Sequence, residues 1–490
     1  MSFEKDLISK KLMILDGAMG TMLQQAGLKP GDCPERLNLE HPEAVKGIHR
    51  AYLEAGSDII HTNTFGANRF KLGAYGLGDR VAEINQSAVK LALEAAGGKA
   101  LVAADIGPTG RMARPFGELE FDQFFEAFAE QVRAAVQAGA DLISIETMSD
   151  LMEVRAAVIA ARENSGIPVM AEMTFEQGGR TLMGTDPATA AIVLDALGTD
   201  IIGANCSGGP AQLLEVIRLM RTVTDRPLVV QPNAGLPYLV AGRTVFPETP
   251  EGMAAYVCQL VAAGAVIIGG CCGTTPDHIR AIRDASRGLK PVLTGVGRPA
   301  AVTGRSRAVV FGWEQVLIGE TLDPARRSDL IEDIRSGRMA EVFDEAGELV
   351  KNGASIIGVN VDIPGIDQPK AMALAVAQIQ AAVDRPVAVS SERPDVIDAG
   401  LKAFHGKALI SIPTEQAGNL DRILPLARRH GAAVLIKTGE NSPPDGASGR
   451  SDPAGQIVKK VLGHGIPVED IFIGHMAEGG TIGQVRPWRL

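Results

Sequence analysis

The sequence predicts an α/β protein of two domains: a (β/α)8 barrel over residues 1–285 and, after a linker at 286–312, a second, incomplete barrel over 313–490. Three observations lead to this prediction. A phrase that ends a helical pattern at Gly and then starts an apolar run recurs along the chain, eight strands fit into the first part, and a break rich in Gly and Pro follows them. A chain of 490 residues is also too long for a single hydrophobic core.

The recurring phrase marks the point where a helix ends and a buried strand begins. It is found at Glu54 to Ile60, Gln137 to Ile143, Leu197 to Ile202 and Ala263 to Ile268. Gly is the expected residue just beyond a helix, and a short turn into a buried strand is one half of a βαβ unit. Eight strands alternating with amphipathic helical patterns are typical of a closed barrel, and the alternative is an open doubly wound sheet. The predicted strands lie near 14–20, 58–65, 100–106, 141–148, 168–175, 200–206, 227–233 and 266–272.

Beyond the locally basic break, the same phrase resumes at Lys351 to Asn360 and at Arg429 to Ile436. Six strands are two fewer than a (β/α)8 barrel needs. The second domain is therefore predicted to be an incomplete barrel or one that needs a neighbour. Its predicted strands lie near 315–320, 354–361, 386–391, 407–412, 432–437 and 470–474.

Composition excludes several classes of protein. A formal charge of −10 with no long basic run argues against a nucleic-acid partner. No apolar stretch approaches the roughly 20 residues that span a bilayer, and the first residues are not a secretory signal, so we expect no membrane association. Five cysteines, an odd and low number for this length, do not make a disulfide framework, and the cytoplasm is the expected location.

Three cysteines stand at the ends of predicted strands, among glycines: Cys206 after the sixth strand, and Cys271 and Cys272 after the eighth. Adjacent residues of a strand point to opposite faces, so two neighbouring thiols can hold one ion only where the strand ends. In a barrel these strand ends share one face, where active sites lie. Three sulfur ligands and one exchangeable position are typical of catalytic zinc, whereas structural zinc usually has four protein ligands. Cys33 and Cys258 are interpreted as ordinary small apolar residues.

Two acidic residues also follow apolar runs on the same predicted face. Asp16 comes after the first strand and Glu146 after the fourth. Acids are rarely buried without a partner, so each could form a salt bridge or cap a helix. As a pair beside a metal, they could instead hold the ammonium group of a ligand. An open zinc site next to such carboxylates suits a zwitterionic amino-acid thiol.

Several motifs resemble the homocysteine S-methyltransferase family, in particular the homocysteine module of cobalamin-dependent methionine synthase. They are Asp16-Gly17-Ala18-Met19-Gly20-Thr21, Thr62-Asn63-Thr64-Phe65, Gly203-Ala204-Asn205-Cys206 and Gly269-Gly270-Cys271-Cys272-Gly273. The resemblance covers residues 8–285. It implies that Cys206, Cys271 and Cys272 bind a catalytic Zn²⁺, that Asp16 and Glu146 contact the homocysteine amino group, and that Asn233 lies near the metal. The implied reaction is methyl transfer to the homocysteine thiol, giving methionine without a general base.

The second domain resembles the pterin-binding domain that carries methyltetrahydrofolate in methionine synthase. The phrase Gly353 to Asp362 carries this resemblance, which implies Asn360 and Asp362 as pterin contacts. The sequence departs from the family at Ser390, where an acid is expected, and at Ile410, where an Asn is expected. Binding of methyltetrahydrofolate therefore stays open, and the alternative is a docking domain that retains the fold without the ligand.

No Asp-x-His-x-x-Gly run, the cobalamin-binding signature of the family's later modules, is present in the sequence. We therefore expect the methyl group to come from methylcobalamin on a corrinoid partner protein supplied in trans. The alternative is a transferase that uses a small donor such as S-methylmethionine or betaine, with the second domain as a non-catalytic docking module. A third interpretation is that the thiols hold structural zinc only.

Overall fold

The computed structural model describes residues 11–240, 243–292, 296–312, 315–325, 327–413, 419–438, 453–475 and 482–488. The contacts between Cα atoms divide the chain into two compact units. One unit consists of Met1–Met112, Asp122–Asp195 and Thr199–Gly297, and the other of Ala113–Phe121, Ala196–Gly198 and Arg298–Leu490. Among the described residues, no helix is long and apolar enough to cross a membrane.

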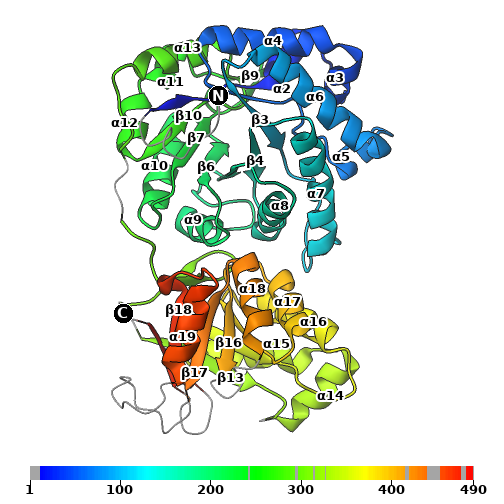
Figure 1. Cartoon of the computed structure of the whole chain (residues 1–490), viewed down its shortest axis with the longest axis vertical. Helices are drawn as coiled ribbons and strands as arrows, with labels where there is room; N and C mark the ends of the chain where they lie inside the picture. Colours follow the sequence, from blue (N-terminus) through cyan, green and yellow to red (C-terminus); the bar gives the residue numbers. More distant parts are fainter. Residues whose placement is uncertain are drawn as a thin grey trace. The chain divides into compact units, whose positions relative to one another are not determined.

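The first unit contains an eight-stranded parallel sheet in the order β1-β10-β7-β6-β5-β4-β3-β2. Its two ends meet through a parallel bridge between Leu15 and Ile59, which closes the sheet into the predicted (β/α)8 barrel. Figure 1 shows these strands at the centre of the unit with helices outside them. The strands are β1 Met13–Ile14, β2 Ile59–His61, β3 Leu101–Ile106, β4 Leu142–Met148, β5 Val169–Met173, β6 Ile201–Cys206, β7 Leu228–Pro232 and β10 Ala265–Ile268.

The helices of the first unit end where the sequence phrase predicts. Gly56 and Gly97 follow α4 and α6 with φ of 107° and 52°, a left-handed conformation that suits Gly because it has no Cβ. The helices are α2 Met19–Gln25, α3 Leu37–Glu40, α4 Pro42–Ala55, α5 Arg69–Gly73, α6 Val81–Ala96, α7 Phe121–Gln137, α8 Leu151–Asn164, α9 Pro187–Ala196, α10 Pro210–Arg221, α11 Pro250–Ala254, α12 Val257–Ala262 and α13 Pro276–Ala285. A short hairpin, β8 Tyr238–Val240 and β9 Arg243–Val245, precedes α11.

The first predicted strand, near 14–20, is wrong over most of its length. β1 ends at Ile14, and α2 already begins at Met19. The backbone N–H of Asp16 still bonds to the carbonyl of Ile59, 3.1 Å away, and the N–H of Gly270 bonds to the carbonyl of Asp16 at 3.0 Å. Asp16 is therefore held at the end of the strand although it lies outside it.

The interior of the first barrel is arranged in layers. An apolar cluster with exposures of 0–1% fills the centre. Its members are Met13, Leu15, Ile59, Leu101, Ala103, Leu142, Met170, Ile201, Val229, Val266 and Ile267. Because side chains of a strand alternate between faces, residues two positions further along point to the same interior. Beyond Met170, Ile59 and Val229, those positions hold Glu172, His61 and Gln231, so a polar layer follows the apolar one toward the carboxyl ends.

The second unit contains a closed barrel of seven strands. Its six parallel strands confirm the predicted ones: β13 Val316–Leu322, β14 Ile356–Asn360, β15 Val387–Ser390, β16 Leu409–Pro413, β17 Ala433–Thr438 and β18 Ile471–His475. The count of parallel strands is two short of eight, as expected. The expected need for a neighbour is wrong, because β19 Ile482–Pro487 runs antiparallel to both β13 and β18 and closes the barrel.

The stretch 286–312, expected as a linker, contains a hairpin of β11 Ala301–Thr303 and β12 Ala308–Val310. Val302 of this hairpin is fully buried in a cluster with Phe311, Ile318 and Phe472 of the second unit. The helices of that unit are α14 Ser328–Ser336, α15 Ala340–Lys351, α16 Gln368–Ala382, α17 Pro394–Ala403, α18 Leu420–His430 and α19 Pro453–Gly463.

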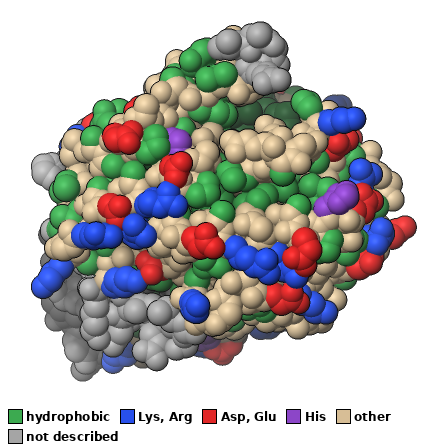
Figure 2. Space-filling view, turned by 90° about the horizontal axis from the view of Figure 1, so that it is seen from above, with side chains coloured by type: hydrophobic (Ala, Val, Ile, Leu, Met, Phe, Trp, Pro, Cys, Tyr) green, Lys and Arg blue, Asp and Glu red, His purple; other side chains and the backbone are tan. Residues whose placement is uncertain are grey.

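One face of the molecule shows how the surface charge is distributed. In Figure 2, Lys and Arg side chains alternate with Asp and Glu side chains, and no broad region of one sign stands out on the face in view.

Candidate active site

The three cysteines of the first barrel lie together at the carboxyl ends of its strands. Cys206 is the last residue of β6, and Cys271 and Cys272 lie in the loop that follows β10. Their Sγ atoms all lie within 4.8 Å of one another. Because β7 is the only strand between β6 and β10 in the sheet, these two strand ends can converge. Three sulfur atoms at this spacing can surround a single metal ion.

The backbone near the ends of β4 and β6 is strained. Thr147, Cys206 and Ser207 have φ of 60°, 60° and 57°. A left-handed conformation costs a residue with a side chain about 1–2 kcal/mol, and such strain is concentrated at functional sites. At Cys206 it ends the extended conformation of β6 at the residue that carries the thiol.

The loop that carries Cys271 and Cys272 is fixed by Thr274. The buried Thr274 hydroxyl donates to the carbonyl of Cys271, 2.7 Å away, and accepts a bond from the N–H of Ala18 at 3.1 Å. A Cβ at either Gly17 or Gly270 would lie 2.6 Å from the Thr274 oxygen, closer than real contacts allow. These two glycines therefore let the loop after β1 and the cysteine loop pack on one threonine.

Asn233 provides an oxygen beside the sulfur atoms. Its Nδ2 donates to the carbonyl of Ser207 at 3.0 Å. Its Oδ1 is buried and has no hydrogen-bond partner among the described residues. A buried polar atom without a partner is costly, so it indicates a group that binds there. Cysteine thiolates, with an oxygen that substrate could displace, are a ligand set that zinc accepts. The residues present fit a zinc ion.

The three thiols also share protons in a way that favours one thiolate. Hydrogen bonds from Cys271 and Cys272 lower the pKa of Cys206 to about 3. The same bond to Cys206 raises the pKa of Cys272 to about 12 and that of Cys271 well above its ordinary value. Hydrogen bonding within the cluster therefore favours the thiolate form at Cys206, which is the form that binds a metal ion.

Asp16 is buried in an ion pair with His61, a residue that the sequence analysis missed. Oδ1 of Asp16 lies 2.9 Å from Nδ1 of His61, and Oδ2 accepts the backbone N–H of His61 at 2.9 Å. Nε2 of His61 lies 3.0 Å from the Ser144 hydroxyl. Although burial alone would lower it, the charge of Asp16 raises the pKa of His61 to about 10. Each oxygen of Asp16 thus accepts one bond and retains a second acceptor site for a ligand.

Glu146 lies near the end of β4, 9% exposed, and is held from one side. Its Oε2 accepts bonds from Nδ2 of Asn205 at 3.0 Å and from Nε2 of Gln231 at 3.3 Å. Both bonds that described residues make to Glu146 thus end on Oε2, which leaves Oε1 for a ligand. The amide of Asn205 also reaches Sγ of Cys271, 3.9 Å away. Asn205 therefore links the acid to the sulfur cluster.

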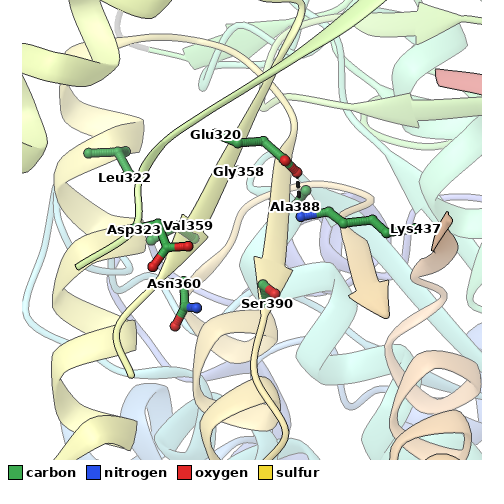
Figure 3. Close-up of a pocket in the computed structure, with 9 residues that line it drawn as sticks. All are labelled: Glu320, Leu322, Asp323, Gly358, Val359, Asn360, Ala388, Ser390 and Lys437. Atoms are coloured by element: carbon green, nitrogen blue, oxygen red, sulfur yellow. Dashed lines mark ion pairs between the residues drawn. The ribbon is translucent and has the colours of Figure 1, made fainter. Parts of the chain in front are cut away.

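The mouth of the second barrel contains the other predicted residues. Figure 3 shows Lys437 of β17 and Glu320 of β13 joined by an ion pair, with Asn360, Ser390 and Asp323 around them. Asn360 thus lines the pocket as predicted, but its Oδ1 already accepts the N–H of Asp362 at 2.8 Å. Asp362 itself is exposed, bonds to Gln368 and is not among the lining residues.

These contacts occupy part of the polar groups that a pterin would need. A pterin ring needs carboxylate or amide groups with free acceptor positions, because each buried N–H of the ring requires a partner. The carboxylate of Glu320 is paired with Lys437, and Asn360 is bonded to its own backbone loop. The third-strand position that the family fills with an acid is Ser390. We therefore derive no step through a folate.

Both halves of the chain match known protein families. Residues 13–286 match the family model described as homocysteine S-methyltransferase, and residues 328–464 match that of pterin binding enzymes. Methionine synthase of Mycobacterium tuberculosis is 32% identical over 458 residues, and that of Mycobacterium leprae is 30% identical over 463 residues. Both matches cover 88% of this chain but only 38% of the relative, so the chain spans well under half of these proteins.

A solved structure agrees with the first barrel. The metallated form of the homocysteine methyltransferase MmuM from Escherichia coli is 26% identical, with a TM-score of 0.50, over 57% of this chain and 97% of the other. The first family model spans more than half of the 490 residues and contains the whole sulfur cluster. The chain belongs to the homocysteine S-methyltransferase family.

Proposed function

We propose that this chain methylates the thiol of homocysteine, giving methionine, at a zinc ion held by Cys206, Cys271 and Cys272. The observation that carries the proposal is the cluster of three Sγ atoms within 4.8 Å of one another, next to Asn233, whose Oδ1 has no partner among the described residues. The existence of a metallated form of the Escherichia coli relative supports binding of a metal by this chain. A bound Zn²⁺ would supply Lewis acidity, which keeps a coordinated thiol in its nucleophilic thiolate form at neutral pH.

The residues around the cluster bind and orient the amino acid. Glu146 offers Oε1 to the ammonium group of homocysteine, while Asn205 and Gln231 hold Oε2. Asp16 adds a second carboxylate whose position is fixed by His61. Two acids that fix the ammonium direct the thiol toward the sulfur cluster. No side chain then has to act as a general base, since the thiol proton is lost on binding.

We further propose that the methyl donor is a methyl-corrinoid carried outside these 490 residues. Two observations support it. The relatives that match nearly the whole chain are named methionine synthase and are much longer, and the second barrel is related to pterin-binding enzymes while the acid Glu320 of its own pocket is paired with Lys437. The second barrel then serves as a docking domain for the corrinoid carrier.

The test measures zinc, thiol binding and donor use on the whole chain. We expect one zinc per chain, release of about one proton on addition of homocysteine, and methionine formation with a methylcobalamin-loaded carrier. A chain that holds no zinc under reducing conditions, or that binds homocysteine equally well without it, would overturn the zinc proposal. Rapid turnover with S-methylmethionine or betaine alone would overturn the donor. Tight binding of methyltetrahydrofolate would overturn the role given to the second barrel.

A further inference from the structure

Glu172 is a fully buried carboxyl group that the proposed reaction does not use. It lies on β5, directly beyond Met170 of the apolar layer, with an exposure of 0%. Its partner in the sheet is Gly203 of β6, where a Cβ would lie 1.9 Å from the carbonyl oxygen of Val229. Because this layer has no side chain at Gly203, Glu172 of β5 can meet Gln231 of β7 across β6.

Glu172 is connected to the substrate acid through one amide. Nε2 of Gln231 donates to Oε1 of Glu172 at 2.6 Å and to Oε2 of Glu146 at 3.3 Å. Burying a carboxyl group is costly, and the other oxygen of Glu172, Oε2, has no hydrogen-bond partner among the described residues. An apolar side chain would fill the same space without the free-energy cost of burying a carboxyl group, so space-filling alone does not explain a glutamate here.

Burial also sets the charge of this group. Burial, together with the nearby charge of Glu146, raises the pKa of Glu172 to about 8. At neutral pH Glu172 therefore carries its proton, and it supplies a neutral oxygen acceptor to Gln231. A neutral acceptor does not repel the charge that Glu146 needs in order to bind an ammonium group.

We propose that Glu172, acting through Gln231, is a positioning residue that fixes Glu146 for recognition of the substrate amino group. Oε1 of Glu172 orients the Gln231 amide, the amide N–H holds Oε2 of Glu146, and Oε1 of Glu146 stays turned toward the ligand. The consequence is selectivity for thiols that carry an α-amino group. This inference rests on the proposed function, since it assumes that Glu146 contacts the homocysteine ammonium.

The experiment compares two thiols on the zinc-loaded full chain: homocysteine, and 4-mercaptobutyrate, which lacks only the amino group. Glu172→Ala should weaken homocysteine binding about tenfold, because Gln231 is then no longer oriented and its hydrogen bond to the charged Glu146 is lost, and losing one hydrogen bond to a charged group usually has an effect of this size. Binding of 4-mercaptobutyrate and the zinc content should stay unchanged. Glu172→Gln is the matched control, because its amide keeps a neutral oxygen acceptor, and it should bind homocysteine like the wild type.

Gln231→Leu keeps the inference testable if Glu172→Ala fails to fold, and it should show the same selective loss. Equal losses for both thiols, or a Glu172→Gln variant as weak as Glu172→Ala, would overturn the positioning role. Failure of the proposed function gives a different result: a wild type that binds both thiols equally or holds no zinc. That outcome would overturn the inference together with its basis.

Discussion

The two barrels of this chain differ in the polar groups at the carboxyl ends of their strands. In the first barrel, Oδ1 of Asn233 and Oδ1 of Asp105 are buried at these ends and have no hydrogen-bond partner among the described residues. In the second, the hydroxyl of Ser411 is also without a described partner, but the acid and the base of the pocket, Glu320 and Lys437, satisfy one another. Unsatisfied buried groups are costly and persist where a ligand uses them. Shared topology therefore does not imply shared function, and the pairing of the polar groups distinguishes the two sites.

Of the changes that test this difference between the two barrels, loss of one sulfur ligand should have the largest effect, and that effect is on zinc affinity. Cys206→Ala should reduce zinc affinity by more than about 100-fold, because even changes in outer-shell partners of a metal cost 10- to 100-fold. Homocysteine binding should be lost with the zinc. Zinc content by atomic absorption and homocysteine affinity by calorimetry measure both effects.

Cys258→Ala is the matched control for that experiment. Cys258 is an exposed cysteine on α12, outside the cluster of three. Its removal should change neither zinc content nor affinity. If both variants lost zinc to the same extent, the metal would depend on the general thiol content of the chain and not on the first barrel's strand ends.

Much of the first barrel is predictable from its sequence because its signals are local. A Gly after each helix and an apolar run after each Gly are set by backbone conformation and burial, so all eight strands were found near their observed positions. The cluster of three cysteines is predictable for the same reason, because each cysteine follows one of these apolar runs. β1 was predicted too long, because Gly17 and Gly20 were read as part of a strand end and not as a turn into α2.

The features that the sequence analysis did not predict depend on contacts between strands that are distant in the sequence. His61, Gln231 and Glu172 lie in one layer of the barrel, and the contacts among them depend on how strands far apart in the sequence are placed side by side. Lys437 lies in a strand that was predicted, yet its pairing with Glu320 joins two strands far apart in the sequence. β19 contains Gly483 and Pro487, and its apolar and polar residues do not alternate, so it lacks the pattern that marks a strand.

Buried histidines provide a second, smaller contrast between the barrels. His49 on α4 of the first is fully buried, and neither ring nitrogen has a partner among the described residues. Burial lowers its pKa from 6.5 to about 4. In the second barrel, Nε2 of the buried His430 lies 2.9 Å from Oδ1 of Asp398. Although burial opposes it, the bond to His430 helps to lower the pKa of Asp398 below its ordinary value.

The sign of the pH effect follows from these pKa values. Between pH 6.5 and about 4 the unfolded state binds a proton that folded His49 does not, so His49 makes stability fall as the pH drops through this window. The loss is about 3 kcal/mol below the window. Stability from Asp398 is lost only at lower pH. His49→Leu should remove the slope between pH 6.5 and 4, as measured by native-state hydrogen exchange of α4, corrected for intrinsic rates.

The stability of His49→Leu has to be compared with that of the wild type at each pH, because buried acids of the same barrel change stability with pH in the opposite direction. The raised pKa of Glu153, about 7, makes stability fall as the pH rises from 4.5 to 7. Because both proteins contain Glu153, its contribution cancels when the free energy of unfolding of one protein is subtracted from that of the other. Parallel pH profiles for wild type and His49→Leu would mean that the histidine is not the acid-sensitive group of this barrel.

The smallest expected effect tests the self-paired pocket. The side chains of Glu320 and Lys437 are only 13% and 17% exposed, so removing one partner leaves a largely buried charge without compensation. Glu320→Gln and Lys437→Met should each destabilise the second barrel by about 1–3 kcal/mol, while the double variant should lose less than the sum, with a coupling of about 1–2 kcal/mol.

Urea unfolding followed by hydrogen exchange of β13 and β17 measures these changes. Lys351→Met, which removes the exposed pair with Glu348, should cost much less stability than either substitution in the pocket, because exposed ion pairs are screened by solvent. Zinc content and homocysteine affinity should stay at wild-type values in all four variants, because the pair belongs to the second barrel. Additive losses from the two single substitutions would mean that Glu320 and Lys437 do not stabilise one another, and the pocket would then have charged groups available for a ligand, as the first barrel does.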